Sequence, residues 1–137
     1  MWMPGPSSRF AVAIHVLLIL AMHPGRSICS DSIASSVGTN PVLIRRMMGT
    51  LRSAGLVASR AGSLGGFMLG KPASGISLDA VYRAVEESQV FHQHEPNKDC
   101  PIGRRIQPIC RKVFSEAEMA LVDSLKDKTI ADLVDLA

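Results

Sequence analysis

The sequence has few cysteines and few aromatic residues, and each shortage excludes a class of protein. Three cysteines in 137 residues are too few for a disulfide framework. An aromatic content of 4 % is too low for the stacking platforms that bind single-stranded nucleic acid. Apolar residues make up 47 % and charged residues 20 % of the chain, which is typical of a globular protein. The length is that of one domain with a core of its own.

The chain also lacks a long apolar run. The most apolar stretch is residues 10–22, which follow Arg9, whereas a helix that spans a bilayer needs about 20 residues. The stretch resembles the apolar part of a signal peptide, but His15 interrupts it and no cleavage site of small residues follows. Its apolar residues at helical spacing predict a buried first helix with Ser7 or Ser8 as N-cap. We therefore expect a cytoplasmic protein whose cysteines are reduced.

Acidic residues are absent from positions 32–78. Residues 1–78 carry seven basic residues and one acid, Asp31, for a net charge of +6, whereas residues 79–137 carry eight basic and eleven acidic residues, for −3. This division predicts that the first half meets a polyanion and the second half does not. A basic surface that is merely solvated is the alternative that charge alone leaves open.

Two short helices joined by a tight turn are predicted in the basic half. Ser30 would cap a helix over residues 31–37, and Asn40 followed by Pro41 would start a second helix that ends near Ala54. One face of this second helix carries Leu43, Met47, Thr50, Leu51 and Ala54, and the opposite face carries Arg45, Arg46, Gly49, Arg52 and Ser53. The pattern indicates a helix-turn-helix whose second helix could enter a major groove.

Two short apolar segments around a glycine-rich loop come next. Residues 56–60 and 67–69 flank Gly62, Gly65 and Gly66, and this pattern predicts a β-hairpin. No Lys-Ser or Lys-Thr pair follows the glycines, so a phosphate-binding loop is not indicated. A hairpin directly after a helix-turn-helix is a wing, and Arg60 near its tip could enter a minor groove.

The rest of the chain predicts helices separated by a polar loop. A helix would run from Ser77 to about Glu87, a loop over residues 91–100, a long helix over 103–126, and a short last helix after Thr129. A stripe at near-heptad spacing runs along the long helix; its members are Ile106, Cys110, Val113, Ala117, Ala120, Leu121 and Ser124. A helix this long in so small a protein needs a partner. We therefore expect a homodimer, with Ile106, Cys110, Val113, Ala117 and Leu121 in the interface.

The order of these motifs resembles the Rrf-two family of bacterial winged helix-turn-helix regulators, and within it the subgroup typified by YwnA. Residues 9–20, 40–46, 59–69 and 76–86 carry the family resemblance, and residues 100–107 and 129–133 carry that to the subgroup. The resemblance implies a mainly α fold with a small β-hairpin wing and a long C-terminal dimerisation helix. It also implies a DNA-binding domain over residues 1–75, a helical dimerisation and sensor region over 76–137, and a homodimeric repressor that binds a palindromic operator.

With this resemblance, DNA contacts are expected from three places in the basic half. Thr39 and Asn40 would act at the start of the recognition helix, and Val42, Arg45, Arg46 and Arg52 along it. Ser59, Arg60 and Gly62 would act from the wing. The competing class is a winged-helix module that binds another protein and never meets DNA, and the acid-free stretch argues against it.

The cysteines raise the questions of a cofactor and of a sensor. Members of the family that hold an iron–sulfur cluster carry three cysteines ahead of the long helix, whereas here only Cys100 and Cys110 occur there; we therefore expect no cluster. Cys100 lies in a polar loop beside Lys98, Arg104 and Arg105, and basic neighbours lower the pKa of a thiol. Cys100 is thus a candidate sensor, with an unreactive structural thiol as the open alternative.

The loop histidines allow two further hypotheses. His92, His94 and Cys100 could supply ligands to a zinc-like ion, but their spacing matches no closed structural site, so we expect no metal. Cys100 and His94 could form a nucleophile pair, but no third group orients it, so we expect no enzyme. A regulator that senses a metal or a small ligand without redox chemistry remains an alternative.

Overall fold

The computed structural model describes residues 6–63, 65–86, 91 and 93–137. Within these residues the elements follow in the order α1 (Pro6–Ala21), α2 (Ser30–Val37), α3 (Pro41–Ser53), β1 (Val57–Arg60), β2 (Gly66–Leu69), the 3-10 turn η1 (Ala73–Gly75), α4 (Leu78–Val85), α5 (Ile106–Lys126) and α6 (Ile130–Val134). The expected fold, mainly helical with a β-hairpin and a long C-terminal helix, is confirmed.

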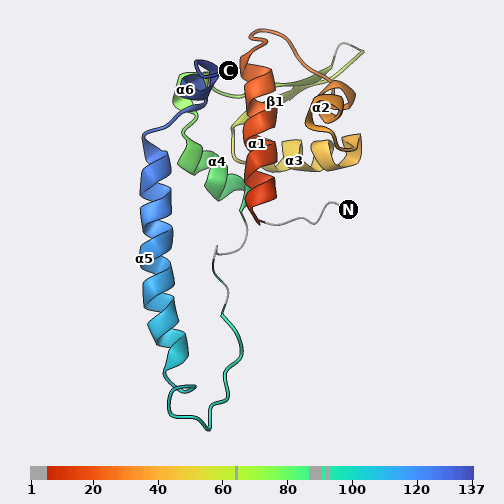
Figure 1. Cartoon of the computed structure of the whole chain (residues 1–137). Coiled ribbons are helices and arrows are strands. Elements are labelled where there is room, and N and C mark those ends of the chain that lie inside the picture. The colour runs from red at the N-terminus through yellow and green to blue at the C-terminus, as the bar shows by residue number, and fades with distance from the viewer. Residues whose placement is uncertain (1–5, 64, 87–90, 92) are drawn as a thin grey trace.

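Helix α1 forms the centre of the hydrophobic core. Its residues Ala13, Val16 and Leu17 are fully buried, and α2, α4, α6 and β2 all pack against it, as Figure 1 shows for the arrangement of these elements. The predicted burial of this first helix is thus confirmed. The predicted cap is wrong: the helix begins at Pro6, so Ser7 and Ser8 lie inside its first turn. No helix among the described residues is long and apolar enough to span a membrane.

The predicted helix-turn-helix is present as α2 and α3. Helix α2 begins at Ser30 with Cys29 as N-cap, so the predicted cap, Ser30, is wrong by one residue. Gly38 ends α2 in the left-handed conformation with φ of 84°, which glycine adopts at no steric cost. At the start of α3 the side chain of Asn40 accepts a hydrogen bond from the Leu43 N–H at 3.0 Å, as the sequence predicted.

The buried face of α3 differs from the predicted one. Leu51 is buried as predicted, together with Ile44 and Met48, whereas Leu43, Met47 and Thr50 of the predicted face are only half-buried and Ala54 is exposed. Successive residues lie about 100° apart around a helix, so the buried face is turned by about one position. The reason is that α3 packs on α2, β1 and α4 together, and their combined placement decides which flank is covered.

Strands β1 and β2 form the predicted antiparallel hairpin, in which Arg60 pairs with Gly66. A third segment joins it, because Ile28 and Phe67 exchange backbone hydrogen bonds of 2.9 and 2.8 Å. A Cβ atom at position 66 would overlap the backbone carbonyl of Ile28, so this close approach requires a glycine. The hairpin is thereby tied to the segment that leads into α2.

The C-terminal helices differ in how they meet the core. Helix α6 returns to α1 through Ile130, whose N–H donates to the Ile76 carbonyl at 2.9 Å and whose side chain is fully buried. Helix α5 has no buried residue among its 21 and extends away from the body formed by the other helices, with the loop that precedes it at its far end (Figure 1). It begins at Ile106 rather than at Gly103, because residues 101–105 form turns.

Candidate nucleic-acid interface

The outer face of α3 carries the basic side chains that the sequence singled out. Arg45, Arg46 and Arg52 are exposed, and Val42 beside them is 56 % exposed. No Asp or Glu occurs between residues 32 and 78, so neither α3 nor the hairpin contributes a carboxylate to this face. The face therefore offers cations and one apolar side chain. Cations suit the phosphates of a DNA duplex, and an arginine or an apolar side chain can contact the base edges in the groove between them.

Two of these arginines are held in place by serine hydroxyls. Arg45 donates from Nη1 to the Oγ of Ser30 at 3.2 Å, and Arg52 donates from Nη1 to the Oγ of Ser59 at 3.0 Å. The first bond joins α3 to the start of α2, and the second joins it to the hairpin. The sequence identified Ser59 but missed Ser30, because nothing in the local pattern indicates that α2 brings Ser30 beside α3.

The turn and the hairpin place the remaining predicted residues around this helix. Thr39 is half-buried and Asn40 is exposed, although the side-chain oxygen of Asn40 is already engaged by the Leu43 N–H. Ser59, Arg60 and Gly62 are all exposed at the hairpin. Among the described residues, no hydrogen bond or ion pair holds the side chain of Arg46 or of Arg60, so their guanidinium groups remain available to a ligand.

Gly49 also lies on this outer face, and its substitution gives a test of how the helix is built. A Cβ atom at position 49 would meet nothing within 4 Å, and alanine is favoured over glycine inside a helix by about 0.5–1 kcal/mol. We expect Gly49→Ala to raise the free energy of unfolding by that amount in urea titrations. Gly38→Ala is the matched control: its surroundings are equally open, but its φ is 84°, so it should lose about 1–2 kcal/mol. Equal effects of the two changes would contradict the assigned backbone conformations.

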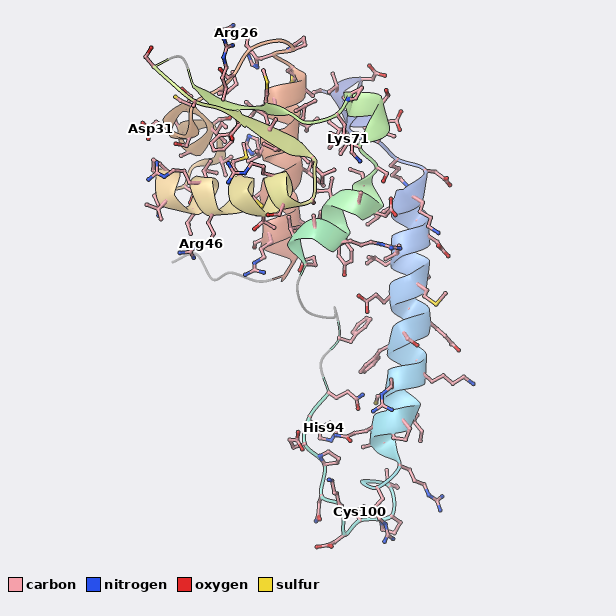
Figure 2. The ribbon with its side chains drawn as sticks, turned by 180° about the vertical axis from the view of Figure 1, so that it is seen from behind. Arg26, Asp31, Arg46, Lys71, His94 and Cys100 are labelled. Carbon is pink, nitrogen blue, oxygen red and sulfur yellow. The ribbon has the colours of Figure 1, made fainter. Side chains whose placement is uncertain are left out.

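The three cysteines are free thiols in three different places. Cys100 is exposed at the tip of the loop before α5, at the far end of the molecule from Arg46 (Figure 2). Cys29 is exposed at the start of α2, with its Sγ 3.2 Å from the Oγ of Ser32. The hydrogen bond with the Ser32 hydroxyl is the main cause that lowers the pKa of the Cys29 thiol. Sequence reasoning missed this, since it depends on Cys29 being the N-cap of α2.

The ligands for a metal do not come together among the described residues. No group of three or more His, Cys, Asp or Glu side chains is placed there to hold an ion. His94 is exposed, and His92 of the predicted trio lies outside the described residues. Cys29 lies at the N-cap of α2, Cys100 in the loop before α5 and Cys110 on α5, so within one chain they do not fit an iron or iron–sulfur site.

Helix α5 exposes the apolar stripe that the sequence predicted to meet a second copy. Of the predicted stripe, Val113 is 55 % and Leu121 37 % exposed, and Ala117 is exposed as well; Ile109, which was not predicted to belong to it, is also 55 % exposed. Ile106 and Cys110 are half-buried on the side where the Phe114 ring stacks on Phe91 with centroids 5.0 Å apart. Exposed apolar side chains gathered along one helix are typical of surfaces at which proteins associate.

Known proteins resemble this chain over almost its whole length. The family described as Rrf2, iron-dependent transcriptional regulator, matches residues 6–136. YwnA of Bacillus subtilis (strain 168), named as an HTH-type transcriptional regulator, is 42 % identical over 93 % of this chain and 96 % of its own. A crystal structure described as that of a DNA-binding protein is 39 % identical, with a TM-score of 0.75 over 91 % of this chain and 97 % of the other. CymR, the global cysteine regulator of B. subtilis, is 22 % identical and shares the fold, with a TM-score of 0.72 over 100 % and 99 % of the two chains.

Proposed function

This chain belongs to the Rrf2 family of DNA-binding transcriptional regulators, which are not enzymes, and on that premise we propose that it is a homodimeric cytoplasmic repressor of transcription. Its winged helix-turn-helix would bind double-stranded operator DNA, with α3 in the major groove and the hairpin in the minor groove. The alternative of a module that binds only other proteins does not fit the family.

The observation that carries this proposal is that α3 and the hairpin, both without carboxylates, are tied together and expose arginines. The Arg52–Ser59 hydrogen bond of 3.0 Å ties α3 to the hairpin, and Arg45 and Arg46 on the helix and Arg60 on the hairpin are each exposed. In this assignment Val42, Arg45 and Arg46 approach base edges or phosphates, and Arg52 together with Thr39 and Asn40 positions the helix. Ser59, Arg60 and Gly62 follow the minor groove.

The second copy in the proposed dimer would lie on the exposed stripe of α5. Val113, Ala117 and Leu121 would pack against the same residues of the partner across a two-fold axis, with Ile106 and Cys110 at the edge. A two-fold dimer presents two α3 helices and so reads a palindromic site. In this arrangement residues 1–75 hold the DNA contacts and residues 76–137 the dimer contacts, although Ile76, Val81 and Ile130 share the core of the first part.

Arg46→Ala tests the proposed contact to DNA. An operator is first selected from random duplexes by binding to the wild-type protein, and affinities are then measured by fluorescence anisotropy. We expect the variant to lose about 1–3 kcal/mol, with relaxed preference at one position of each half-site, if Arg46 reads a base. Arg111→Ala, an equally exposed arginine on α5, should bind as the wild type does. Unchanged affinity of Arg46→Ala would remove this residue from the interface, and absence of any DNA binding by the wild type would overturn the proposal.

We also propose that modification of the Cys100 thiol weakens operator binding. For this to happen, the modified thiol must be accommodated at lower free energy in the DNA-free dimer than in the DNA-bound dimer. Operator binding is titrated with peroxide in the wild type, Cys100→Ser and Cys29→Ser, and the sites are followed by mass spectrometry. We expect Cys29, whose pKa is lowered, to react readily, but only Cys100→Ser to protect DNA binding. Equal losses in wild type and Cys100→Ser would show that Cys100 is not the sensor.

A further inference from the structure

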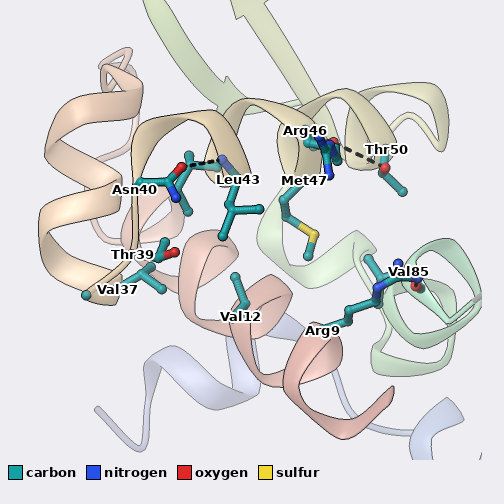
Figure 3. Close-up of a pocket in the computed structure, with 12 residues that line it drawn as sticks. Arg9, Val12, Val37, Thr39, Asn40, Leu43, Arg46, Met47, Thr50 and Val85 are labelled. Carbon is teal, nitrogen blue, oxygen red and sulfur yellow. Dashed lines mark hydrogen bonds between the residues drawn. The ribbon is translucent and has the colours of Figure 1, made fainter. Parts of the chain in front are cut away.

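A pocket of about 710 Å³ lies between α1 and α3, beside the proposed DNA-binding face and separate from the cysteines. Figure 3 shows Val12 and Arg9 on α1 facing Leu43 and Met47 on α3 across it, with Val85 at the end of α4 closing one side. This volume falls within the range of about 300–1,000 Å³ that is typical of sites for small organic molecules. The walls are mostly apolar, because Leu43 and Met47, the half-buried residues of α3, face this space.

The charged groups in the wall of the pocket are two arginines. Arg9 and Arg46 line it and no Asp or Glu does. Arg9 donates from Nη1 to the Val85 carbonyl at 3.4 Å and lies close to Glu86, whose carboxyl pKa is raised by burial and lowered by Arg9. The charge of Arg9 is therefore partly balanced. The guanidinium of Arg46 has no such partner among the described residues, so Arg46 is the cation that a bound ligand would meet.

From this combination of apolar walls and an unbalanced cation, we propose that the pocket binds a small organic anion with an apolar body. Its anionic group pairs with Arg46, and its body contacts Val12, Leu43 and Met47. Because the proposed function places Arg46 on DNA, the anion and the operator compete for the same side chain. Because thermodynamic coupling between two ligands is reciprocal, the anion must lower the apparent affinity of the protein for DNA by the same factor by which DNA lowers its affinity for the anion.

Two dyes with the same aromatic rings test the pocket without DNA. Anilinonaphthalene sulfonate carries an anionic group and N-phenylnaphthylamine does not, and the fluorescence of both rises in an apolar site. We expect the sulfonate to bind about ten- to a hundredfold more tightly, which is the contribution of a charged hydrogen-bonded pair. Arg46→Gln should remove this difference, whereas Arg45→Gln, a change to the neighbouring arginine that is bonded to Ser30, should preserve it.

Val12→Phe, on α1 and outside the DNA-binding face, should fill the pocket and weaken both dyes while operator binding persists. A melting curve shows whether this variant folds, and if it does not, the Arg46 and Arg45 comparison still decides. Equal binding of the two dyes, or sulfonate binding that Arg46→Gln leaves unchanged, would overturn the pocket assignment; loss on Val113→Asp would place the dye on α5 instead.

The coupling to DNA has its own readout. With the sulfonate at about ten times its dissociation constant, the apparent operator affinity should fall about tenfold for each protomer. Sulfonate binding with no effect on the operator would overturn the competition. Failure of the proposed function looks different, because the dyes would then bind as expected to a protein that binds no DNA.

Discussion

Operator binding is expected to weaken by about 10³- to 10⁵-fold when the salt concentration rises from about 50 to about 200 mM. Each protomer presents Arg45, Arg46, Arg52 and Arg60 as exposed cations, and a dimer would present twice that number. If each neutralises one phosphate, counterion release gives a slope of about −7 for the logarithm of the affinity against the logarithm of the salt concentration. Isothermal titration or anisotropy at four salt concentrations measures this slope.

Single substitutions measure how much each arginine contributes to the salt dependence of operator binding. Arg60→Ala should reduce its magnitude by about two for a dimer, because each protomer loses one phosphate contact. Arg111→Ala on α5 should leave it unchanged. A flat salt response with retained binding would show that the α3 and hairpin face does not meet the phosphate backbone, and a slope insensitive to Arg60→Ala would remove the hairpin from the interface.

Val113→Asp is expected to convert the dimer into a monomer and to abolish tight operator binding. Val113 is 55 % exposed in the single chain at the middle of the apolar stripe, and the two-fold axis would bring two carboxylates into one apolar seam. Burying unpaired charge costs several kcal/mol, so the dimer dissociation constant should rise by about 10²-fold or more. Sedimentation velocity at micromolar concentration measures the assembly, and anisotropy measures the loss of binding to a palindromic site.

Ser115→Asp provides the matched control for this change. Ser115 lies on the same helix and is exposed, but it is two residues away and so on another side of α5. The same charge placed there should leave both the dimer and DNA binding intact. A wild-type protein that sediments as a monomer, or a Val113→Asp variant that remains dimeric, would contradict the proposed interface.

Local chemistry determined the order and type of the elements. Asn40 followed by Pro41 predicted the start of α3, and the Asn40 cap is formed as expected. The glycines between two short apolar segments predicted the hairpin, because glycine adopts the backbone conformations that tight turns require, and Gly62 lies at a positive φ of 101°. The absence of acids from residues 32–78 predicted that this half of the chain meets a polyanion, since neither α3 nor the hairpin has a carboxylate of its own to place beside its arginines.

Only the tertiary structure decided which sides of these elements face inward and which side chains meet. On α3, Ile44 and Met48 are buried in the hydrophobic core, whereas Leu43 and Met47 are only half-buried. The reason is that α2, β1 and α4 together pack on the flank that carries Ile44 and Met48. The half-buried flank left over forms one wall of the pocket. Long-range placement likewise brings Arg52 to Ser59 and Arg45 to Ser30. These contacts depend on how separate segments pack, and helical periodicity alone leaves two adjacent apolar flanks equally eligible for burial.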